Sequence, residues 1–233
     1  MSDERVLHHA YWQKVPVNPE YPTSMSKMLL MDDPAEAERD GQADTEEVLA
    51  LVPTLPKAAR IIELAAGVGR FTPKLVELAG PGGSVLAYDF VEDFCAQNRA
   101  QCRALGLSNV DVRAEDVLVA TFPSDVDLVF ASWIFMYLAN AEVDAVLAKI
   151  ATALRPGGSL VFRESCVKKD EVHDGEWPRF PGEHPCRYRS GRWYSERLAR
   201  LGGHIHTGAH VLRVWDDAND PNAQLAWVWQ KAS

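Results

Sequence analysis

A short apolar run that ends in a glycine-containing turn constrains the fold of this chain more than any other feature. The run covers residues 60–64 (RIIEL), and the turn at residues 65–69 (AAGVG) leads into an amphipathic segment. This pattern predicts a strand, a tight turn and a helix, with Gly67 and Gly69 where the backbone must approach a ligand closely. Twenty residues beyond Gly69, a second apolar run ends in Asp89. An acid at this place holds a ribose diol in Rossmann-like folds.

The spacing distinguishes between the folds that bind nucleotides. A dinucleotide fingerprint requires a small residue where Thr72 stands, and a P-loop requires Gly-Lys-Ser/Thr, which does not follow this strand. The pattern Glu-x-Ala-x-Gly-x-Gly resembles that of S-adenosylmethionine (SAM) methyltransferases. In those enzymes the acid, here Glu63, can meet the cationic methionine end of the cofactor. We therefore assign Glu63, Ala65, Gly67 and Gly69 to a SAM site. A Rossmann dehydrogenase is a weaker interpretation. The purely structural alternative is a turn that only links the strand to the helix.

Composition limits the other classes of function. The 233 residues are 47% hydrophobic, which suffices for one buried core, and the net charge of -9 argues against a nucleic-acid surface. The first residues lack the apolar run of a signal peptide, and no window approaches a membrane span. The four cysteines show no zinc spacing, and Cys95 and Cys102 fit core packing on one helix. We expect a cytoplasmic protein without a metal, nucleic-acid or membrane partner.

Strands and helices alternate up to about residue 165. Strands are expected at 60–65, 84–88, 109–113, 127–131 and 159–163, and helices at 70–79, 92–105 and 141–154. Such alternation implies a parallel sheet with right-handed crossovers. Two further β runs, at 209–215 and 224–230, predict a closing hairpin. The sequence thus predicts an α/β chain with the class I methyltransferase Rossmann-like fold, a seven-stranded, mostly parallel sheet with a C-terminal antiparallel hairpin and helices on both faces.

The chain divides into an arm and one domain. Residues 1–43 are polar and contain proline, and we expect them to form an N-terminal arm or lid over the active site. Residues 44–47 (DTEE) resemble a capping box that opens a helix. Residues 44–233 are then a single SAM-binding methyltransferase domain.

Acids follow the second and third predicted strands, where ligands of open α/β sheets bind. Asp89, with Phe90 beside it, is expected to accept hydrogen bonds from both ribose hydroxyls. Asp116 is expected to accept the adenine amino proton, while the backbone of Val117 binds a ring nitrogen. A helix N-cap for Asp89 and a solvated loop position for Asp116 are the alternatives.

An aromatic segment, residues 132–138 (SWIFMYL), follows the fourth strand. Ser132 is expected to face the cofactor, and Trp133 and Tyr137 to shape the acceptor pocket beside the sulfonium. Core packing is expected for the remaining apolar members, Ile134, Phe135 and Leu138.

Residues 188–194 (YRSGRWY) contain a candidate anion site. Tyr188, Arg192 and Tyr194 supply two phenol donors and one guanidinium, which binds phosphate or carboxylate in a bidentate manner. Arg187 and Arg189 are expected to be solvated. A surface basic patch is the alternative.

These stretches are similar to the phosphoethanolamine N-methyltransferases, especially the first methyltransferase domain of the plant-type enzymes. The matching stretches are Tyr11-Trp12, ELAAGVGRFT from Glu63, YDFVE from Tyr88, SWIFMYL from Ser132, FRESC from Phe162 and YRSGRWY from Tyr188. The resemblance implies methyl transfer from SAM to the nitrogen of a phosphobase, with S-adenosylhomocysteine (SAH) as the product. It implies that Tyr188, Arg192 and Tyr194 hold the phosphate and that Tyr11 closes over the substrate.

The acceptor atom stays open. An ammonium acceptor needs a base, for which Tyr11 and Tyr137 are the candidates, whereas a carboxylate is already ionised. A carboxyl O-methyltransferase acting on a small (di)carboxylic acid is therefore the alternative function. A SAM-fold partner subunit without activity is a more distant one. A small anionic metabolite is the expected substrate, and the protein is expected to be a monomer or homodimer.

Overall fold

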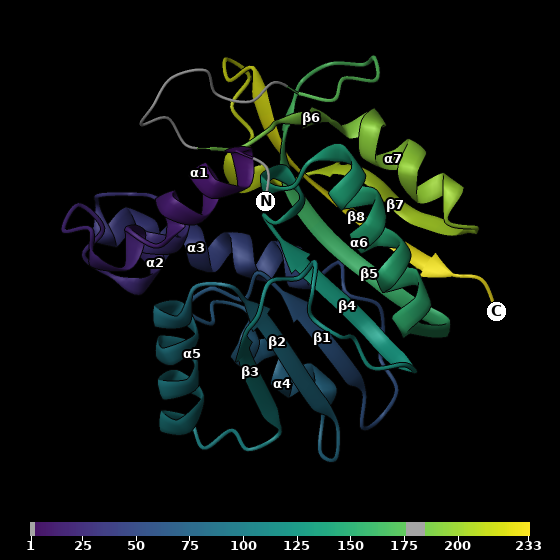
Figure 1. Cartoon of the computed structure of the whole chain (residues 1–233), viewed down its shortest axis with the longest axis horizontal. Helices are drawn as coiled ribbons and strands as arrows, with labels where there is room; N and C mark the ends of the chain where they lie inside the picture. Colours follow the sequence, from purple (N-terminus) through teal and green to yellow (C-terminus); the bar gives the residue numbers. More distant parts are fainter. Residues whose placement is uncertain (1–2, 176–184) are drawn as a thin grey trace.

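The centre of the protein is one mixed β-sheet (Figure 1). The computed structural model describes residues 3–175 and 185–233. The strands are β1 (Arg60–Leu64), β2 (Ser84–Asp89), β3 (Val110–Ala114), β4 (Val126–Ser132), β5 (Leu154–Val167), β6 (Arg189–Ser190), β7 (Gly203–Val211) and β8 (Asn222–Lys231). They are ordered β3-β2-β1-β4-β5-β8-β7, and the short β6 pairs with β5 beside this path. Pairs among β1 to β6 are parallel, while β8 runs antiparallel to both β5 and β7. The predicted class I methyltransferase fold is confirmed.

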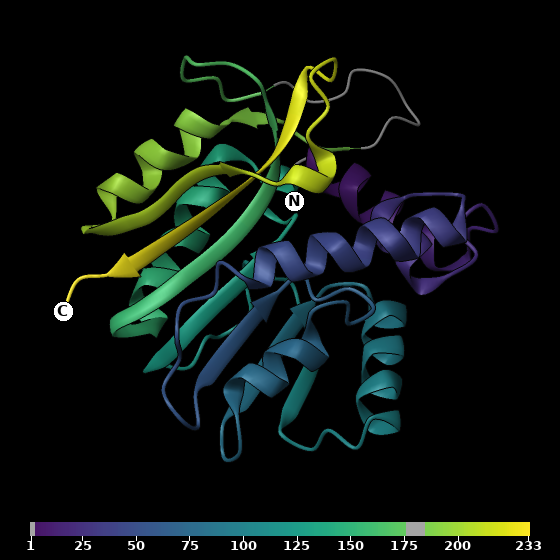
Figure 2. The ribbon, with the colours of Figure 1, turned by 180° about the vertical axis from the view of Figure 1, so that it is seen from behind.

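Helices cover both faces of this sheet, as Figures 1 and 2 show from opposite sides. One face carries α3 (Pro34–Leu49), α4 (Thr72–Ala79) and α5 (Glu92–Ala104), and the other carries α6 (Asn140–Ala153) and α7 (Gly191–Arg200). Leu75 of α4 packs in one cluster with Ile61 and Leu128, whereas Leu147 of α6 packs in another with Ile62. Successive strand residues point to opposite faces, so the apolar strands predicted from the sequence are buried on both sides.

The closing hairpin is longer than the sequence indicated. Strand β7 begins at Gly203, and the expected strand end at residues 213–215 is instead a 3-10 turn, η3 (Arg213–Trp215). The first half of β7 gave no apolar signal because β7 is an edge strand, paired only with β8 among the described strands, and most of its side chains are exposed. Polar residues such as His204 and His206 are tolerated there.

The helix expected to open at Asp44 begins ten residues earlier. Helix α3 starts at Pro34, and the side chain of Asp33 accepts hydrogen bonds from the amides of Ala35 and Glu36. An Asp N-cap followed by proline is a strong helix start, which explains why this site prevails over the capping box. Asp44 lies inside the helix with 0% of its surface exposed. The boundary expected between residues 43 and 44 therefore falls within α3.

The residues before α3 form short helices beside the glycine turn. They are α1 (Asp3–Trp12), η1 (Val15–Val17) and α2 (Ser24–Leu29). Tyr11, Trp12 and Met28 pack in one apolar cluster with Val68 of the turn and Phe94 of α5. Among the described residues, no helix is long and apolar enough to cross a membrane.

Candidate active site

The loops after four neighbouring strands surround one cavity at the carboxyl ends of the sheet. Arm residues complete its wall, so the cavity lies where open α/β sheets bind ligands. The described residues that line it are His8, Trp12, Met28, Ala65, Ala66, Gly67, Arg70, Phe71, Tyr88, Asp89, Phe90, Val91, Phe94, Glu115, Asp116, Val117, Ser132, Trp133, Ile134, Tyr137 and Leu138.

The turn after β1 has the backbone shape that the sequence predicted for a ligand loop. Gly67 has φ +53° and Gly69 has φ +93°, and the Gly67 amide donates to Asp89 Oδ2 at 2.9 Å. A β-carbon on Gly69 would collide with the Asn98 amide, so this glycine lets the turn pack on α5. Ala65 also has a left-handed φ of 55°, which costs an L-residue about 1–2 kcal/mol. Among the three, Ala65 and Gly67 line the cavity.

Asp89 lies at the end of β2 beside the glycine turn, and its carboxylate is already oriented. Its Oδ1 accepts from the Val91 amide at 2.9 Å, and Oδ2 accepts from Gly67. Burial raises the pKa of Asp89 to about 6, against the lowering effect of these backbone hydrogen bonds. Each carboxylate oxygen has a second lone pair, so the group retains capacity to accept from a diol.

Asp116 and Val117, after β3, line the same cavity. Asp116 Oδ1 accepts from the Leu118 amide at 2.9 Å, and its Oδ2 lies 3.9 Å from His9 Nε2. The His9 ring stacks on Phe90 with centroids 4.3 Å apart. The structure thus brings together Asp89, Phe90, Asp116 and Val117, the group assigned to the adenosine half of SAM.

Glu63 does not line the cavity. Its carboxylate is 1% exposed and accepts from the Thr72 hydroxyl at 2.6 Å, and Asn98 donates to that hydroxyl. Burial raises the pKa of Glu63 to about 8. Glu63 shares a strand face with Ile61, which faces α4, so strand alternation turns it away from the place expected for the methionine group.

Ser132 and Trp133, after β4, form the wall of the cavity next to the glycine turn. Trp133 has φ +53°, and its indole Nε1 donates to Gln224 Oε1 at 2.8 Å. The Arg163 guanidinium lies 3.6 Å from the centre of the Trp133 ring. This contact and the hydrogen bond fix the indole that the sequence assigned to the acceptor pocket.

The arm places an imidazole against Tyr137. The His8 ring stacks on the Tyr137 ring with centroids 4.6 Å apart and planes within 3°, and both residues line the cavity. The expected base Tyr11 is not among the described lining residues. His8 was missed from the sequence because residues 1–43 were not interpreted as helical. On a helix, His8 and Trp12 are four residues apart and share a face.

The expected anion group of Tyr188, Arg192 and Tyr194 is not assembled. Arg192 is 61% exposed and pairs with Glu196 one helical turn away. Tyr194 is 0% exposed and packs in the main core. Tyr188 packs beside Tyr137, and none of the three lines the cavity in the described part of the chain. Tyr194 and Arg192 are two positions apart on α7, so the helix turns them to different sides.

Arg189, expected to be solvated, is fully buried. Its guanidinium donates to the carbonyls of Phe135 and Leu138 at 2.7 and 2.6 Å and to Asn140 Oδ1 at 2.9 Å. Because it satisfies the backbone around η2 (Phe135–Tyr137), it holds Tyr137 in place.

Glu164 supports the same loop from β5. Its carboxylate accepts from the amides of Ile134, Phe135 and Met136 at 2.7–3.1 Å. Burial raises the pKa of Glu164 to about 7. The FRESC and YRSGRWY segments therefore contribute a buried acid and a buried arginine that shape the cavity wall indirectly.

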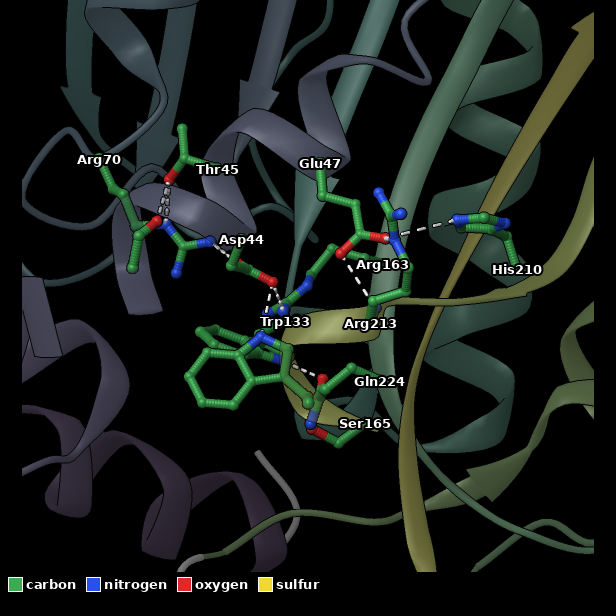
Figure 3. Close-up of polar contacts among 12 residues, drawn as sticks. Asp44, Thr45, Glu47, Arg70, Trp133, Arg163, Ser165, His210, Arg213 and Gln224 are labelled. Carbon is green, nitrogen blue, oxygen red and sulfur yellow. Dashed lines mark hydrogen bonds and ion pairs between the residues drawn. The ribbon is translucent and has the colours of Figure 1, made fainter. Parts of the chain in front are cut away.

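A buried ion cluster stands behind Trp133 (Figure 3). Asp44 of α3 pairs with Arg70, accepts from Arg163 Nη2 at 2.5 Å and accepts from Trp215 Nε1 at 2.6 Å. Arg70 and Arg163 are 4% and 0% exposed. Burial lowers the pKa of Arg163 to about 9. This cluster, Asp44 with Arg70 and Arg163, joins α3 to the glycine turn and to β5.

Comparison with known proteins finds a matching family model and relatives with similar sequences. The family model described as "Methyltransferase domain" matches residues 61–158. Phosphoethanolamine N-methyltransferase of Triticum aestivum is 29% identical over all of this chain and 45% of its own length. Phosphoethanolamine N-methyltransferase 1 of Caenorhabditis elegans is 32% identical over 84% of this chain and 39% of its own length. The chain therefore spans less than half of these relatives.

Solved structures agree on the fold. Phosphoethanolamine N-methyltransferase 1 of Haemonchus contortus, in complex with phosphoethanolamine and S-adenosylhomocysteine, superposes with a TM-score of 0.75 over 100% of this chain and 50% of its own, at 24% identity. Geranyl diphosphate C-methyltransferase of Streptomyces coelicolor reaches a TM-score of 0.70 over the whole of both chains at 14% identity. The chain is thus similar over its whole length to about half of the length of the phosphoethanolamine N-methyltransferases, and it carries a methyltransferase domain with the class I fold.

Proposed function

We propose that this protein transfers a methyl group from SAM to the nitrogen of phosphoethanolamine or a related phosphobase. The observation that supports this proposal is a cavity in which the arm meets the loops assigned to SAM, in a chain similar over its whole length to phosphoethanolamine N-methyltransferases. The adenosine half of SAM lies against Asp89, Phe90, Asp116 and Val117. The acceptor enters between the arm and the β4 loop. We propose accordingly that the residues before α3, which make up most of the arm expected at residues 1–43, act as the lid of this site.

The reaction is a direct displacement. The lone pair of the amine attacks the SAM methyl carbon, a nitrogen–carbon bond forms, and the carbon–sulfur bond breaks to leave neutral SAH. The apolar wall of Trp12, Phe94 and Trp133 excludes water and holds donor and acceptor in line, which is the main source of rate in such a step.

The ammonium form of the acceptor must lose a proton before it attacks. Burial raises the pKa of Tyr11 to about 12 and that of Tyr137 well above its usual value, so both phenols stay protonated near neutral pH. Phenols in this state do not serve as ground-state bases. His8 lies against Tyr137 in the cavity, and imidazole is the side chain suited to accept a proton at this pH. We assign the proton acceptor to His8, with Tyr137 holding its ring.

A carboxyl O-methyltransferase is the second candidate. The same protonated phenols favour it, because a carboxylate acceptor needs no base. The two candidates differ in pH dependence, since only the amine must be deprotonated.

A SAM-consumption screen against phosphobases and small mono- and dicarboxylates tests the proposal. We expect turnover with phosphoethanolamine and a kcat/KM that rises across neutral pH. Turnover of diacids alone, with a kcat/KM that is constant from about pH 6 to 8, would contradict this proposal and support a carboxyl O-methyltransferase. Consumption with none of these acceptors would contradict both.

His8→Gln tests the base in the same assay. We expect kcat to fall about 10²-fold or more, the usual contribution of a general base, with SAH affinity changed less than twofold. His9→Gln changes the adjacent residue of α1 and is the matched control. Its kcat/KM should still rise across neutral pH. An unchanged kcat and pH limb in His8→Gln would exclude this role of His8 while leaving the proposed reaction in place.

A further inference from the structure

The loop between β3 and β4 carries two of the groups proposed to hold the adenine of SAM, the carboxylate of Asp116 and the backbone amide of Val117. Both residues line the cavity. The loop turns tightly here, because the amides of Val119 and Ala120 both donate to the Asp116 carbonyl, at 3.0 and 2.8 Å. Recognition of a base at this loop depends on the direction in which its polar groups point, so the contacts that hold the loop from outside matter.

Lys149 of α6 provides such a contact. Its Nζ donates to the carbonyl of Val117 at 2.8 Å and to that of Leu118 at 3.5 Å. An ammonium has three donors and no acceptor, and hydrogen bonds from a charged donor are stronger than neutral ones. Lys149 therefore fastens the loop to α6.

The peptide group between Val117 and Leu118 connects Lys149 to Asp116. Its carbonyl accepts from Lys149, and its N–H, which belongs to Leu118, donates to Asp116 Oδ1 at 2.9 Å. Because a peptide group is planar, the position of the carbonyl oxygen fixes the direction of the N–H. The carboxylate is planar too, so the place of Oδ1 determines that of Oδ2. Lys149 thus orients the Asp116 carboxylate through one peptide group.

Further contacts keep Lys149 at this place. Its Nζ lies 4.4 Å from the centre of the Phe122 ring, within the range of a cation–π contact. The Phe122 ring packs on that of Tyr88, which lines the cavity, with centroids 5.5 Å apart. Burial lowers the pKa of Lys149, and the charges of Asp116 and Glu115 act in the opposite direction. The ammonium therefore lies close enough to both carboxylates to interact with them.

We propose that Lys149 is a positioning residue for adenine recognition. By holding the Val117–Leu118 peptide group, it orients the Asp116 carboxylate and so sets the preference for a purine that carries an amino group. This inference rests on the proposed position of the adenosine half of SAM and not on any particular acceptor.

S-inosylhomocysteine separates this role from a general effect on binding. It differs from SAH only in the base, which carries an oxygen in place of the amino group and a ring N–H in place of an acceptor nitrogen. Against Asp116 and the Val117 amide, acceptor then faces acceptor and donor faces donor. We would measure both affinities by calorimetry without a methyl acceptor, and define the selectivity as the Kd of S-inosylhomocysteine divided by that of SAH. We expect a wild-type selectivity of about 10- to 100-fold, the range for hydrogen bonds to charged groups.

Lys149→Met should lower this selectivity about three- to tenfold, the effect of one weakened hydrogen bond. The thioether donates nothing, so the peptide group and the Asp116 carboxylate can turn. Lys149→Arg keeps the charge and the donors and should restore most of the selectivity. Lys74→Met is the matched control, because Lys74 is 58% exposed and pairs with Glu77 on α4, and it should keep the wild-type selectivity.

Two outcomes overturn the proposal. Equal losses of affinity for both ligands in Lys149→Met would show that Lys149 only supports the fold. Unchanged affinities would show that the loop keeps its shape without Lys149. If Lys149→Met does not fold by thermal melting, Lys149→Gln, which keeps an uncharged donor, carries the test with the same ratio.

Asp116→Asn tests the position of the adenine separately. Its amide presents a donor where the carboxylate presents an acceptor, so the selectivity should fall. Wild-type selectivity in Asp116→Asn would contradict the proposed position of the adenosine. A fall in Asp116→Asn together with wild-type selectivity in Lys149→Met would overturn the role of Lys149 alone.

Discussion

At the scale of single residues, burial decides the chemistry of the acids in this site. Asp89 and Glu63 stand near the ends of neighbouring parallel strands, and both have raised pKa values. Asp89 faces the cavity, whereas Glu63 faces Thr72. Desolvation is the leading cause in both cases, and the hydrogen bonds to Asp89 offset part of it. The two acids therefore titrate in different ranges and affect different properties, Asp89 ligand binding and Glu63 stability.

The pKa of Asp89 predicts that cofactor affinity depends on pH. Below about pH 6 its carboxyl is protonated and loses acceptor capacity for the ribose hydroxyls. We expect the Kd of SAH to rise as pH falls through about 6, measured by calorimetry between pH 5 and 7.5. Asp89→Asn should bind SAH weakly at all pH values and show a smaller slope. An identical slope in the variant would mean that another group is responsible.

At the scale of elements, α3 is joined to the sheet by its buried acid. Asp44 connects this helix to the glycine turn through Arg70, to β5 through Arg163 and to η3 through Trp215. Glu47, one turn later, pairs with Arg213 at 3.0 Å (Figure 3). Removing one partner of a buried pair leaves charges uncompensated, so this position has a large effect on stability.

Asp44→Asn should lower the free energy of unfolding by about 3–5 kcal/mol, because both guanidiniums lose their carboxylate. Urea denaturation at pH 7 measures it. Glu38→Gln on the exposed side of the same helix is the control and should stay within about 0.5 kcal/mol of the wild type. A loss of similar size in both variants would point to helix propensity and not to the cluster.

At the scale of the whole molecule, several buried carboxyls have pKa values that are raised by burial. The pKa values of Asp89, Glu63 and Glu164 rise to about 6, 8 and 7 because burial disfavours their charged forms. At a pH between the ordinary carboxyl pKa values and these raised pKa values, the folded state therefore binds more protons than the unfolded state. The contribution of these three carboxyls to stability is therefore fully present below about pH 4 and is lost as pH rises toward 8.

Glu63→Gln should remove part of this decrease in the free energy of unfolding with rising pH. Its amide oxygen still accepts from Thr72, and the neutral group has no burial cost that depends on pH. We expect the variant to be more stable than the wild type at pH 8 by about 1–3 kcal/mol, since one pKa unit is worth about 1.4 kcal/mol, and to lose that advantage at pH 5. Parallel stability curves for variant and wild type across this range would contradict the assignment.

Much of the fold was predictable from local sequence. The apolar runs that became β1, β2 and β4 are buried on both faces, so their hydrophobicity is continuous and easy to recognise. Strand β7 and the start of α3 were misplaced for opposite reasons. The edge strand needs few apolar residues, and the acid that resembled a helix cap at Asp44 is stabilised by Arg70 and Arg163, which are distant in sequence.

The sequence by itself determined the parallel sheet and the ligand loops, because strand alternation and glycine spacing act over a few residues. It placed Asp89, Asp116 and Ser132 at one edge, since parallel strands end together. Only the tertiary structure decided where the long polar side chains go. Arg192 extends to solvent, Arg189 to backbone carbonyls, and Arg70 into the cavity wall. Their hydrogen-bond partners lie up to 54 residues away, and burial and charge pairing at that separation depend on how the elements pack.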